Sequence, residues 1–475
     1  MGWLSYFALV PLLLLIKSPR KAFVFGWITG VLFYSGLLWW LFFLQAEEAS
    51  FPMLAAGIAI LIAYLSIYVG LFALILSFTK RWLGSTAYLA SPFLWVTFEY
   101  LRGLTLLGFP WGTLAYTQTQ YPTVIQLSSL GGVGLVSGWI LLVNALCVLL
   151  IQSRKSRKKL SLCLIVLAFT ILVPHMWGEA QISAQVGERL RVALLQVNLD
   201  SKRVRDRSYP EEITPAIEKM ILQAAEENPD LLIMPESALP GFLGHQTEYR
   251  AWLSELSART HTPILTGAVR YEYSGGEFKY YNSAFLFRPD GVAECYDKLH
   301  PVPFSERLPY DDVLPWIRNI QLGQGRYSPG REFKVFHLDR SSFSVLICFE
   351  SIFPRLARRF VKEDAHFLVN ITNDSWFGDT PGPYQHAQMA VMRSVENRVP
   401  IARCGNTGIS MLVDPYGRVS QVTEMFTRRV VIGDLVLMKN ATTLYRRWGE
   451  WFSILSLLIT AVSVLGKSLP HRPLD

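Results

Sequence analysis

The chain has 475 residues, 51% of them hydrophobic, and a formal net charge of +8. The apolar residues crowd into 1–177 and 451–466, whereas the stretch between them has the composition of an ordinary water-soluble domain. These features exclude a protein lying wholly in water or wholly in a membrane. Because many basic residues stand in short loops beside apolar stretches, as in membrane-flanking loops, we expect a membrane and no nucleic acid as partner.

Seven apolar stretches are candidate membrane spans, since a spanning helix needs about 20 mainly apolar residues. They are residues 3–16, 22–44, 53–79, 86–101, 125–151, 160–177 and 451–466. The first stretch is short, and we interpret it as a trimmed or tilted span. A cleaved signal peptide is disfavoured because neither a basic n-region nor a small-residue cleavage site accompanies it.

The charges of the connecting loops alternate along the chain. Basic residues follow the first, third and fifth spans, at 17–21, 80–81 and 154–159. Loops rich in Lys and Arg stay in the cytoplasm, so the order of the spans places residues 178–450 on the outer side. The expected domains are a membrane domain of about six helices at 1–177, an extracytoplasmic domain at 178–450, and a last helix with a short cytoplasmic tail at 451–475.

Residues 190–440 alternate short apolar runs with amphipathic segments. The expected strands are 192–197, 231–234, 263–271, 283–287, 343–347, 367–371 and 409–413. Helical periodicity is found over 213–224, and further helices are expected near 249–259 and 388–398. This alternation predicts an α/β domain with helices packed on the faces of sheets.

The five cysteines show no CxxC motif, no His–Cys cluster and no regular spacing. We therefore expect no metal, no disulfide framework and no cofactor. Cys147 and Cys163 lie inside apolar runs and are expected to be packing residues. Cys348 differs from them, because it ends the apolar run SVLI and is followed two residues later by the charged Glu350.

Three side chains at or beside predicted strand ends suit nucleophilic catalysis, because strand ends present side chains to clefts. Cys348 offers a thiol, the carboxylate of Glu236 offers a base that can form the thiolate, and Lys298 offers a fixed cation for an oxyanion. Taken singly, each has an ordinary alternative. Cys348 could be a core cysteine, Glu236 a helix-start carboxylate, and Lys298 a solvated surface lysine.

The order and contexts of these residues (PES, YDKxH and ICFE) resemble the nitrilase superfamily. Two further segments, GFPWGTLAYTQ at 108–118 and NITNDSWFGDTPGPYQH at the start of 370–410, narrow the resemblance. Together with spans on both sides, they resemble the apolipoprotein N-acyltransferase family over almost the whole length. The resemblance implies a polytopic α-helical membrane domain plus an α/β nitrilase-like soluble domain, an αββα sandwich.

The resemblance also implies roles for individual residues. Cys348 corresponds to the nucleophile, Glu236 to the general base and Lys298 to the oxyanion group. Glu306 and Glu350 correspond to supporting carboxylates.

Four aromatic residues are expected to contact substrate: Trp111, Tyr116, Trp376 and Phe377. An interfacial aromatic belt is the alternative for the first two. Core packing is the alternative for the others. Phe349 lies among the supporting residues, where this family usually has a tyrosine.

The implied reaction moves a fatty acyl group from a phospholipid donor to the N-terminal α-amine of a diacylglyceryl-cysteine apolipoprotein, through a thioester on Cys348. The implied location is the bacterial cytoplasmic (inner) membrane, with the catalytic domain on the periplasmic side. One alternative is a membrane-tethered nitrilase-type amidase with the same three residues. A transporter or channel is disfavoured because Glu99 is the main charged residue within the spans.

Overall fold

The computed structural model describes residues 2–44, 50–182, 187–199, 203, 209–239, 247–314, 316 and 326–465. The predicted cytoplasmic tail therefore lies outside the described residues. The chain forms two compact units. A helical unit comprises 1–42, 50–184 and 443–475, and an α/β unit comprises 43–49 and 185–442.

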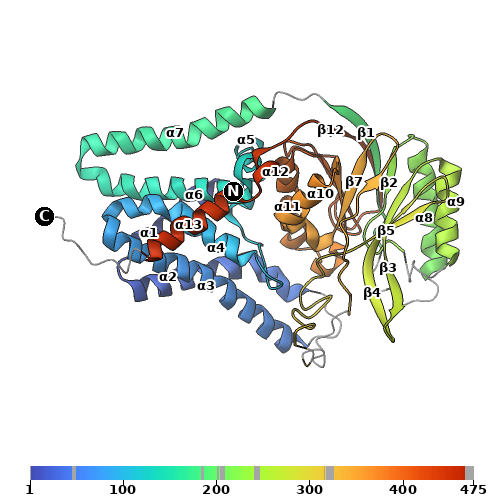
Figure 1. The fold of residues 1–475 in the computed structure, drawn as a ribbon, viewed down its shortest axis with the longest axis horizontal. Coiled ribbons are helices and arrows are strands. Elements are labelled where there is room, and N and C mark those ends of the chain that lie inside the picture. The colour runs from blue at the N-terminus through green and yellow to red at the C-terminus, as the bar shows by residue number, and fades with distance from the viewer. Residues whose placement is uncertain are drawn as a thin grey trace. The chain divides into compact units, whose positions relative to one another are not determined.

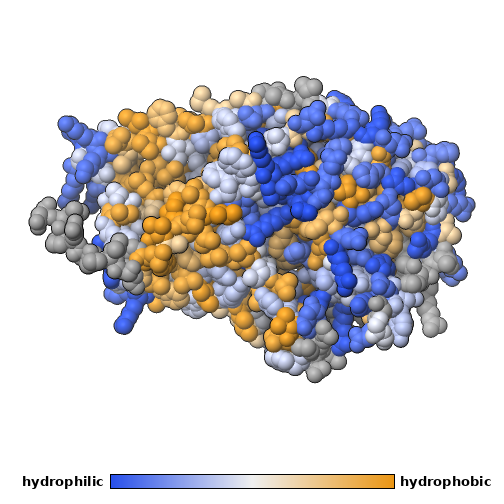
Figure 2. All heavy atoms as spheres, viewed as in Figure 1, coloured by the Kyte–Doolittle hydropathy of each residue, from blue (hydrophilic) through white to orange (hydrophobic). Residues whose placement is uncertain are grey.

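The helical unit consists of helices whose surface is largely apolar (Figures 1 and 2). Its helices are α1 (Val10–Leu15), α2 (Pro19–Leu38), α3 (Phe51–Leu83), α4 (Ser91–Arg102), α5 (Pro122–Ile125), α6 (Ser128–Gln152), α7 (Arg157–Ile182), α12 (Leu444–Trp448) and α13 (Trp451–Leu465). Among the described residues, four helical stretches are long and apolar enough to cross a membrane: Pro19–Phe43, Phe51–Arg102, Ser128–Lys155 and Arg157–Ile182. The apolar helical segments Gly2–Leu15 and Trp451–Leu465 are shorter.

The stretch Phe51–Arg102 contains two of the predicted spans, 53–79 and 86–101. Helices α3 and α4 are joined by a 3₁₀ segment, Gly84–Ala90, which includes the first residues of the second predicted span. The short first span also departs from one straight helix, because it divides into a 3₁₀ turn at Gly2–Tyr6 followed by α1. Hydropathy predicts where the apolar stretches lie, but it could not show how neighbouring helices connect.

Small residues bring α2 and α3 into close contact. A Cβ atom on Gly26 would lie 2.6 Å from the carbonyl oxygen of Val69, and one on Gly30 would lie 2.8 Å from the Cα of Ser66. Lipid tails are as apolar as the helix surfaces, so close van der Waals packing of this kind is what holds membrane helices together. A larger side chain at either glycine would force these helices apart.

The α/β unit contains two six-stranded sheets. The first has the order β12-β1-β2-β3-β4-β5 and the second the order β11-β10-β9-β8-β7-β6. The strands of the first sheet are β1 (Glu188–Gln196), β2 (Leu231–Ile233), β3 (Ile264–Ser274), β4 (Glu277–Phe287), β5 (Ala293–Asp297) and β12 (Arg429–Leu437). Those of the second are β6 (Phe336–His337), β7 (Ser342–Ile347), β8 (Phe367–Thr372), β9 (Ile401–Gly405), β10 (Met411–Val413) and β11 (Val419–Ser420).

Helices cover the outer face of each sheet (Figure 1). Helices α8 (Tyr209–Ala225) and α9 (Thr247–Thr260) pack on the first sheet. Helices α10 (Pro354–Lys362) and α11 (Pro381–Asn397) pack on the second. Strands β1 and β4 contact β9 and β7 across the interior, so the layers run helix, sheet, sheet, helix. The predicted αββα sandwich is confirmed.

Parallel pairing places three functional segments at equivalent strand ends. Strands β1, β2 and β3 pair in parallel through β2, and β7, β8 and β9 pair in parallel through β8. Side chains that follow the carboxyl ends of parallel strands gather at one edge of a sheet. Glu236 follows β2, Cys348 follows β7 and Asn373 follows β8 at these ends.

Candidate active site

Cys348 stands at a strained turn between a strand and a short helix. Strand β7 is buried along its whole length, and Cys348 opens the 3₁₀ turn Cys348–Ile352. Its φ angle is +51°, in the left-handed region that a non-glycine residue adopts only at a cost of about 1–3 kcal/mol. Cys348 remains partly exposed. A thiol at a strained strand end, on a residue that is not fully buried, fits a nucleophile.

Lys298 is held between two carboxylates directly after β5. Its Nζ donates to Oε1 of Glu306 at 2.9 Å and lies 3.7 Å from Oε1 of Glu236. Lys298 is only 1% exposed. Asn282 on β4 links the same carboxylates, because its Nδ2 donates to Glu236 at 2.7 Å and to Glu306 at 3.0 Å. These contacts bring Glu236 together with Lys298 and Glu306, all three of which were predicted as site residues.

The charges of this group are coupled to the thiol. Burial raises the pKa of Cys348, the negative charge of Glu236 adds to that rise, and Lys298 opposes it. Burial also raises the pKa of Glu236, where Lys298 again opposes the rise and Glu306 adds to it. For Lys298, burial favours the neutral amine, but Glu306, Glu236 and Cys348 reverse the effect, so its pKa is raised. The arrangement therefore has a protonated thiol, a basic carboxylate and a permanent cation.

Glu236 and Glu306 are each fixed by a backbone donor as well. The amide of Asn373 donates to Oε2 of Glu236 at 2.7 Å, and the amide of Val302 donates to Oε2 of Glu306 at 2.7 Å. Each carboxylate keeps one oxygen for backbone support while the other faces Lys298 and Asn282. This geometry favours preorganisation, since little rearrangement is needed when charge moves during a reaction.

Glu350 connects the turn of Cys348 to the segment that carries Lys298. Its Oε1 accepts from the hydroxyl of Tyr296 at 2.9 Å and from the amides of Leu299 and His300 at 2.7 and 3.2 Å. Its Oε2 accepts from the amide of Ile347 at 2.8 Å. Burial raises the pKa of Glu350 to about 7. Glu350 therefore supports the site through the backbone rather than by contacting Lys298.

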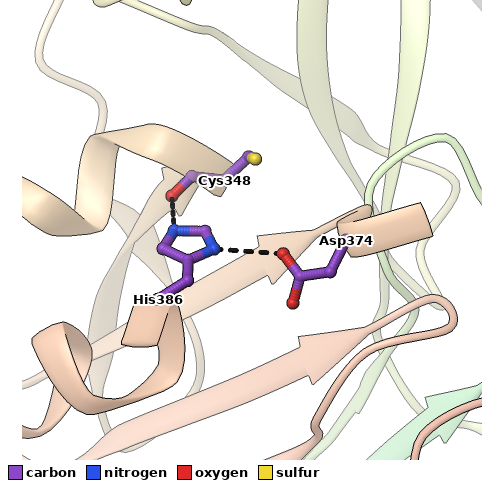
Figure 3. Close-up of side chains that lie close together, drawn as sticks. All are labelled: Cys348, Asp374 and His386. Carbon is purple, nitrogen blue, oxygen red and sulfur yellow. Dashed lines mark hydrogen bonds and ion pairs between the residues drawn. The ribbon is translucent and has the colours of Figure 1, made fainter. Parts of the chain in front are cut away.

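A second buried group lies behind Cys348 (Figure 3). His386 lies 3.1 Å from the Cys348 carbonyl oxygen through Nε2, and 3.0 Å from Oδ1 of Asp374 through Nδ1. Arg403 donates to Oδ2 of Asp374 at 2.8 Å. Burial would raise the pKa of Asp374, but Arg403 and His386 lower it to about 2. Burial, with the charge of Arg403, lowers the pKa of His386.

Cys348, Asp374 and His386 lie close enough together to be considered as metal ligands. Their ligand atoms lie within 4.8 Å of one another, although the sequence showed no His–Cys cluster. Both ring nitrogens of His386 already have polar partners, and Arg403 offsets the charge of Asp374. Figure 3 shows the Cys348 sulfur pointing away from the imidazole ring. These three residues therefore fit a hydrogen-bonded support better than a ligand set.

The four predicted aromatic contacts lie in different surroundings. In the helical unit, Trp111 is 2% exposed with its ring 5.5 Å from that of Trp40, and Tyr116 is 7% exposed. In the α/β unit, Trp376 is exposed, and the ring of Phe377 lies 6.1 Å from that of His386. Trp111 and Tyr116 thus pack within their unit, while Trp376 is open to a ligand. Substrate contact stays a prediction for all four.

Two family models match the chain. Residues 191–443 match the carbon-nitrogen hydrolase model, and residues 1–146 match the apolipoprotein N-acyltransferase N-terminal domain model. Among known relatives, the apolipoprotein N-acyltransferase of Geobacter metallireducens is 34% identical over 99% of this chain and 92% of its own. The chain belongs to the apolipoprotein N-acyltransferase family.

Two other members of this family are similar to the chain in sequence over comparable lengths. The apolipoprotein N-acyltransferase of Methylococcus capsulatus is 31% identical, covering 92% of this chain and 86% of its own. That of Chlorobaculum tepidum is 30% identical, covering 92% and 87%. Membership of this acyltransferase family, together with the apolar helices, makes the chain a bacterial inner-membrane enzyme rather than a transporter or channel.

Sequence reasoning missed several polar residues of this family member's site. Asn282 lies beside Ser283 in the buried half of strand β4, and Arg403 is the one charged residue within strand β9. Asp374 and His386 lie in the segment 370–410, which supported the family resemblance but predicted no role for either residue. A buried charged residue inside an apolar strand, as at Arg403, is the signal that could have identified this group, because such a charge needs a partner.

Proposed function

We propose that the chain transfers a fatty acyl group from a membrane phospholipid to the α-amine of a diacylglyceryl-cysteine apolipoprotein. The observation that carries this proposal is the thiol of Cys348 at a left-handed turn, electrostatically coupled to Lys298 and Glu236. The α/β unit that carries Cys348 belongs to the same chain as the apolar helices. This combination supports lipid substrates rather than small amides.

In the first half-reaction, Glu236 accepts the thiol proton as the Cys348 sulfur attacks the ester carbonyl of the phospholipid. Lys298 and a backbone N–H near Phe349 stabilise the oxyanion, and one such donor is typically worth about 3 kcal/mol. When the carbon–oxygen bond breaks, the lysophospholipid oxygen takes the proton back from Glu236. The acyl group then remains on Cys348 as a thioester.

In the second half-reaction, the acceptor amine attacks the thioester. A terminal amine has an unperturbed pKa of roughly 7.7–8.0, so a useful fraction is uncharged near neutral pH. Glu236 takes the proton lost by the amine and returns it to the departing Cys348 sulfur. An amide bond forms to the lipoprotein, and the free thiol is regenerated.

The orientation of the α/β unit is part of the proposal. The basic loops at 17–21, 80–81 and 154–159 favour the cytoplasm, which places the α/β unit on the periplasmic side. Both proposed substrates carry acyl chains that stay in the bilayer. A catalytic unit tethered by apolar helices at the outer surface of the inner membrane would meet both without extracting either.

The test uses the full-length protein in lipid nanodiscs with acyl-labelled phospholipid and a diacylglyceryl-cysteine peptide. The expected product is the peptide with a third, amide-linked acyl chain. Cys348→Ala should abolish transfer while still folding and inserting. An exposed variant such as Glu363→Gln is the matched control and should keep activity. Hydrolysis of small amides without acyl transfer would support the amidase instead and refute the proposal.

A further inference from the structure

The carbonyl group of Cys348 is held by several buried side chains. Nε2 of His386 lies 3.1 Å from its oxygen, and the hydroxyl of Ser351 donates to it at 3.0 Å. Nδ2 of Asn370 lies 3.5 Å away. His386 is 1% exposed, and the other two are fully buried. Together these contacts fix the plane of the peptide bond between Cys348 and Phe349.

His386 is fixed in turn by charged partners. Its Nδ1 lies 3.0 Å from Asp374 and 3.2 Å from Nη2 of Arg403. Arg403 also donates to Oδ2 of Asp374 and, through Nη1, to Asn370. Asp374 and Arg403 are buried and form an ion pair with each other. This pair holds the imidazole ring of His386 in place. The same group therefore supports two of the contacts to the Cys348 carbonyl.

The partners of His386 place opposing demands on its ring proton. The Asp374 carboxylate and the Cys348 carbonyl only accept hydrogen bonds, whereas the Arg403 guanidinium only donates them. A proton on Nε2 lets His386 donate to the Cys348 oxygen while Nδ1 accepts from Arg403. A proton on Nδ1 lets the ring donate to Asp374 instead, with Nε2 accepting from the hydroxyl of Ser351. The positioning role of His386 requires the first arrangement, which the substitution His386→Gln tests.

We propose that His386 is a positioning residue for acyl transfer, acting through the peptide between Cys348 and Phe349. This inference rests on the proposed function. A trans peptide is planar, so its C=O and N–H point in opposite directions. Holding the Cys348 oxygen thus sets the direction of the Phe349 N–H, and a donor on the oxygen polarises that N–H. His386 also stabilises the left-handed turn that aims the thiol.

The test compares His386→Leu, His386→Gln and Met392→Ala in the full-length protein. Met392 is a fully buried residue of the same helix, α11, and serves as the packing control. Stopped reactions with labelled phospholipid give two quantities: the rate constant of Cys348 acylation and the fraction of enzyme acylated. A small activated ester serves as a second acyl donor that passes through the same type of oxyanion.

We expect His386→Leu to slow acylation about 10- to 100-fold, less than the ~10²–10³-fold lost when an oxyanion donor is removed directly. The acylated fraction should stay near that of the native enzyme. His386→Gln, which keeps an N–H donor, should recover most of the rate. Met392→Ala should lower thermal stability but leave the rate constant unchanged.

A purely structural role for His386 would lower the acylated fraction without changing the rate constant, and that result would overturn the inference. Equal rate constants for His386→Leu and native enzyme with the activated ester would overturn it as well. If the native enzyme reacts with the ester but never with phospholipid, the proposed function fails, while the ester data still decide the role of His386.

Discussion

The ionisation of Glu236 depends on two neighbours of opposite charge. Lys298 lowers its pKa and Glu306 raises it, against a background of burial that raises it further. Glu236 acts as a base only when it is deprotonated. The acidic limb of the pH–rate profile for acylation should therefore report the pKa of this carboxyl, as coupled to its neighbours.

We predict that Glu306→Gln moves this acidic limb to lower pH, by roughly half a unit to one unit. Removing a negative charge beside Glu236 makes its deprotonation easier, so the base form persists at lower pH. The absolute rate should fall as well, because Lys298 loses its closest partner. The measurement is the pH dependence of single-turnover acylation, with the exposed Glu277→Gln as control. A limb displaced to higher pH would contradict the coupling.

Glu236 and Cys348 were predicted as site residues because each is a chemically unusual residue at the end of an apolar strand. Lys298 was predicted from a loop-like stretch, and the contexts of all three match a family. Their partners were not predictable in this way. Asn282 and Arg403 lie inside strands whose pairing only the folded sheets reveal. A polar residue in a strand has many possible partners until the register is known. Sequence reasoning therefore proposed the reacting groups but not the residues that hold them.

At the level of elements, Glu350 joins the end of β7 to the segment after β5. One carboxylate accepts from Ile347 on one side and from Tyr296, Leu299 and His300 on the other. Both segments would otherwise have buried donors without partners. Glu350 thus links the Cys348 turn directly to the Lys298 segment.

Glu350→Gln should destabilise the protein by about 1–3 kcal/mol, because the amide NH₂ cannot accept from donors that now face it. It should also slow acylation, since Lys298 loses its fixed place. Thermal unfolding and single-turnover rates measure the two effects. Glu363, which forms an exposed ion pair with Arg359, supplies the control. The substitution Glu363→Gln should change the free energy of unfolding by less than about 0.5 kcal/mol. A stable, fully active Glu350→Gln variant would refute this role.

Helix α7 contains a proline that removes one helical hydrogen bond, and a donor on the neighbouring helix α6 replaces that bond. Pro174 has no N–H, so the carbonyl of Thr170 loses its helical partner. The indole of Trp139 on α6 donates to this oxygen at 2.7 Å. In an apolar environment such a carbonyl needs an internal donor, since no water replaces the missing bond.

We predict that Trp139→Phe lowers the apparent melting temperature in detergent, and that it does so less when combined with Pro174→Ala. Alanine restores the N–H that satisfies Thr170, so the indole is no longer required. Such a double-mutant cycle should show coupling of at least about 0.5 kcal/mol. Additive effects of the two substitutions would show that the Trp139 contact does not compensate the proline.

The elements recovered from sequence were those with strong apolar runs, such as β1, β3, β7 and β8. Strands β5 (AECYD), β9 (IARCG) and β12 (RVVIGDLVL) were missed because charged residues interrupt their apolar character. Helix α10 was missed for the same reason, since PRLARRFVK is largely basic. In each case sheet pairing or packing outweighs local composition, and that information is absent from a single sequence.

For the whole molecule, the central structural prediction is the side of the membrane on which each unit faces. We expect Lys155→Cys, in the basic loop after α6, to be cytoplasmic, and Asp290→Cys, in an exposed turn of the α/β unit, to be periplasmic. A membrane-impermeant maleimide should label Asp290→Cys in intact spheroplasts above the native background, and Lys155→Cys only after permeabilisation. The opposite pattern would refute the proposed topology.

The two half-reactions should follow a fixed order, because donor and acceptor would use one site in turn. A single nucleophile and a single general base suit a ping-pong sequence, in which acyl-enzyme forms before the acceptor binds. Glu236→Gln and Lys298→Ala should each slow both halves, since each half needs a base and passes through an oxyanion. A variant that slowed only one half would separate these roles.

The most direct measurement is to mix the enzyme with acyl-labelled phospholipid alone, quench the reaction and locate the label by mass spectrometry. Label should appear on Cys348 without acceptor, be released by hydroxylamine as a thioester is, and move to a diacylglyceryl-cysteine peptide added afterwards. Cys348→Ala should carry no label. If label reaches the peptide only when both substrates are present together, and never rests on Cys348, the thioester mechanism is contradicted.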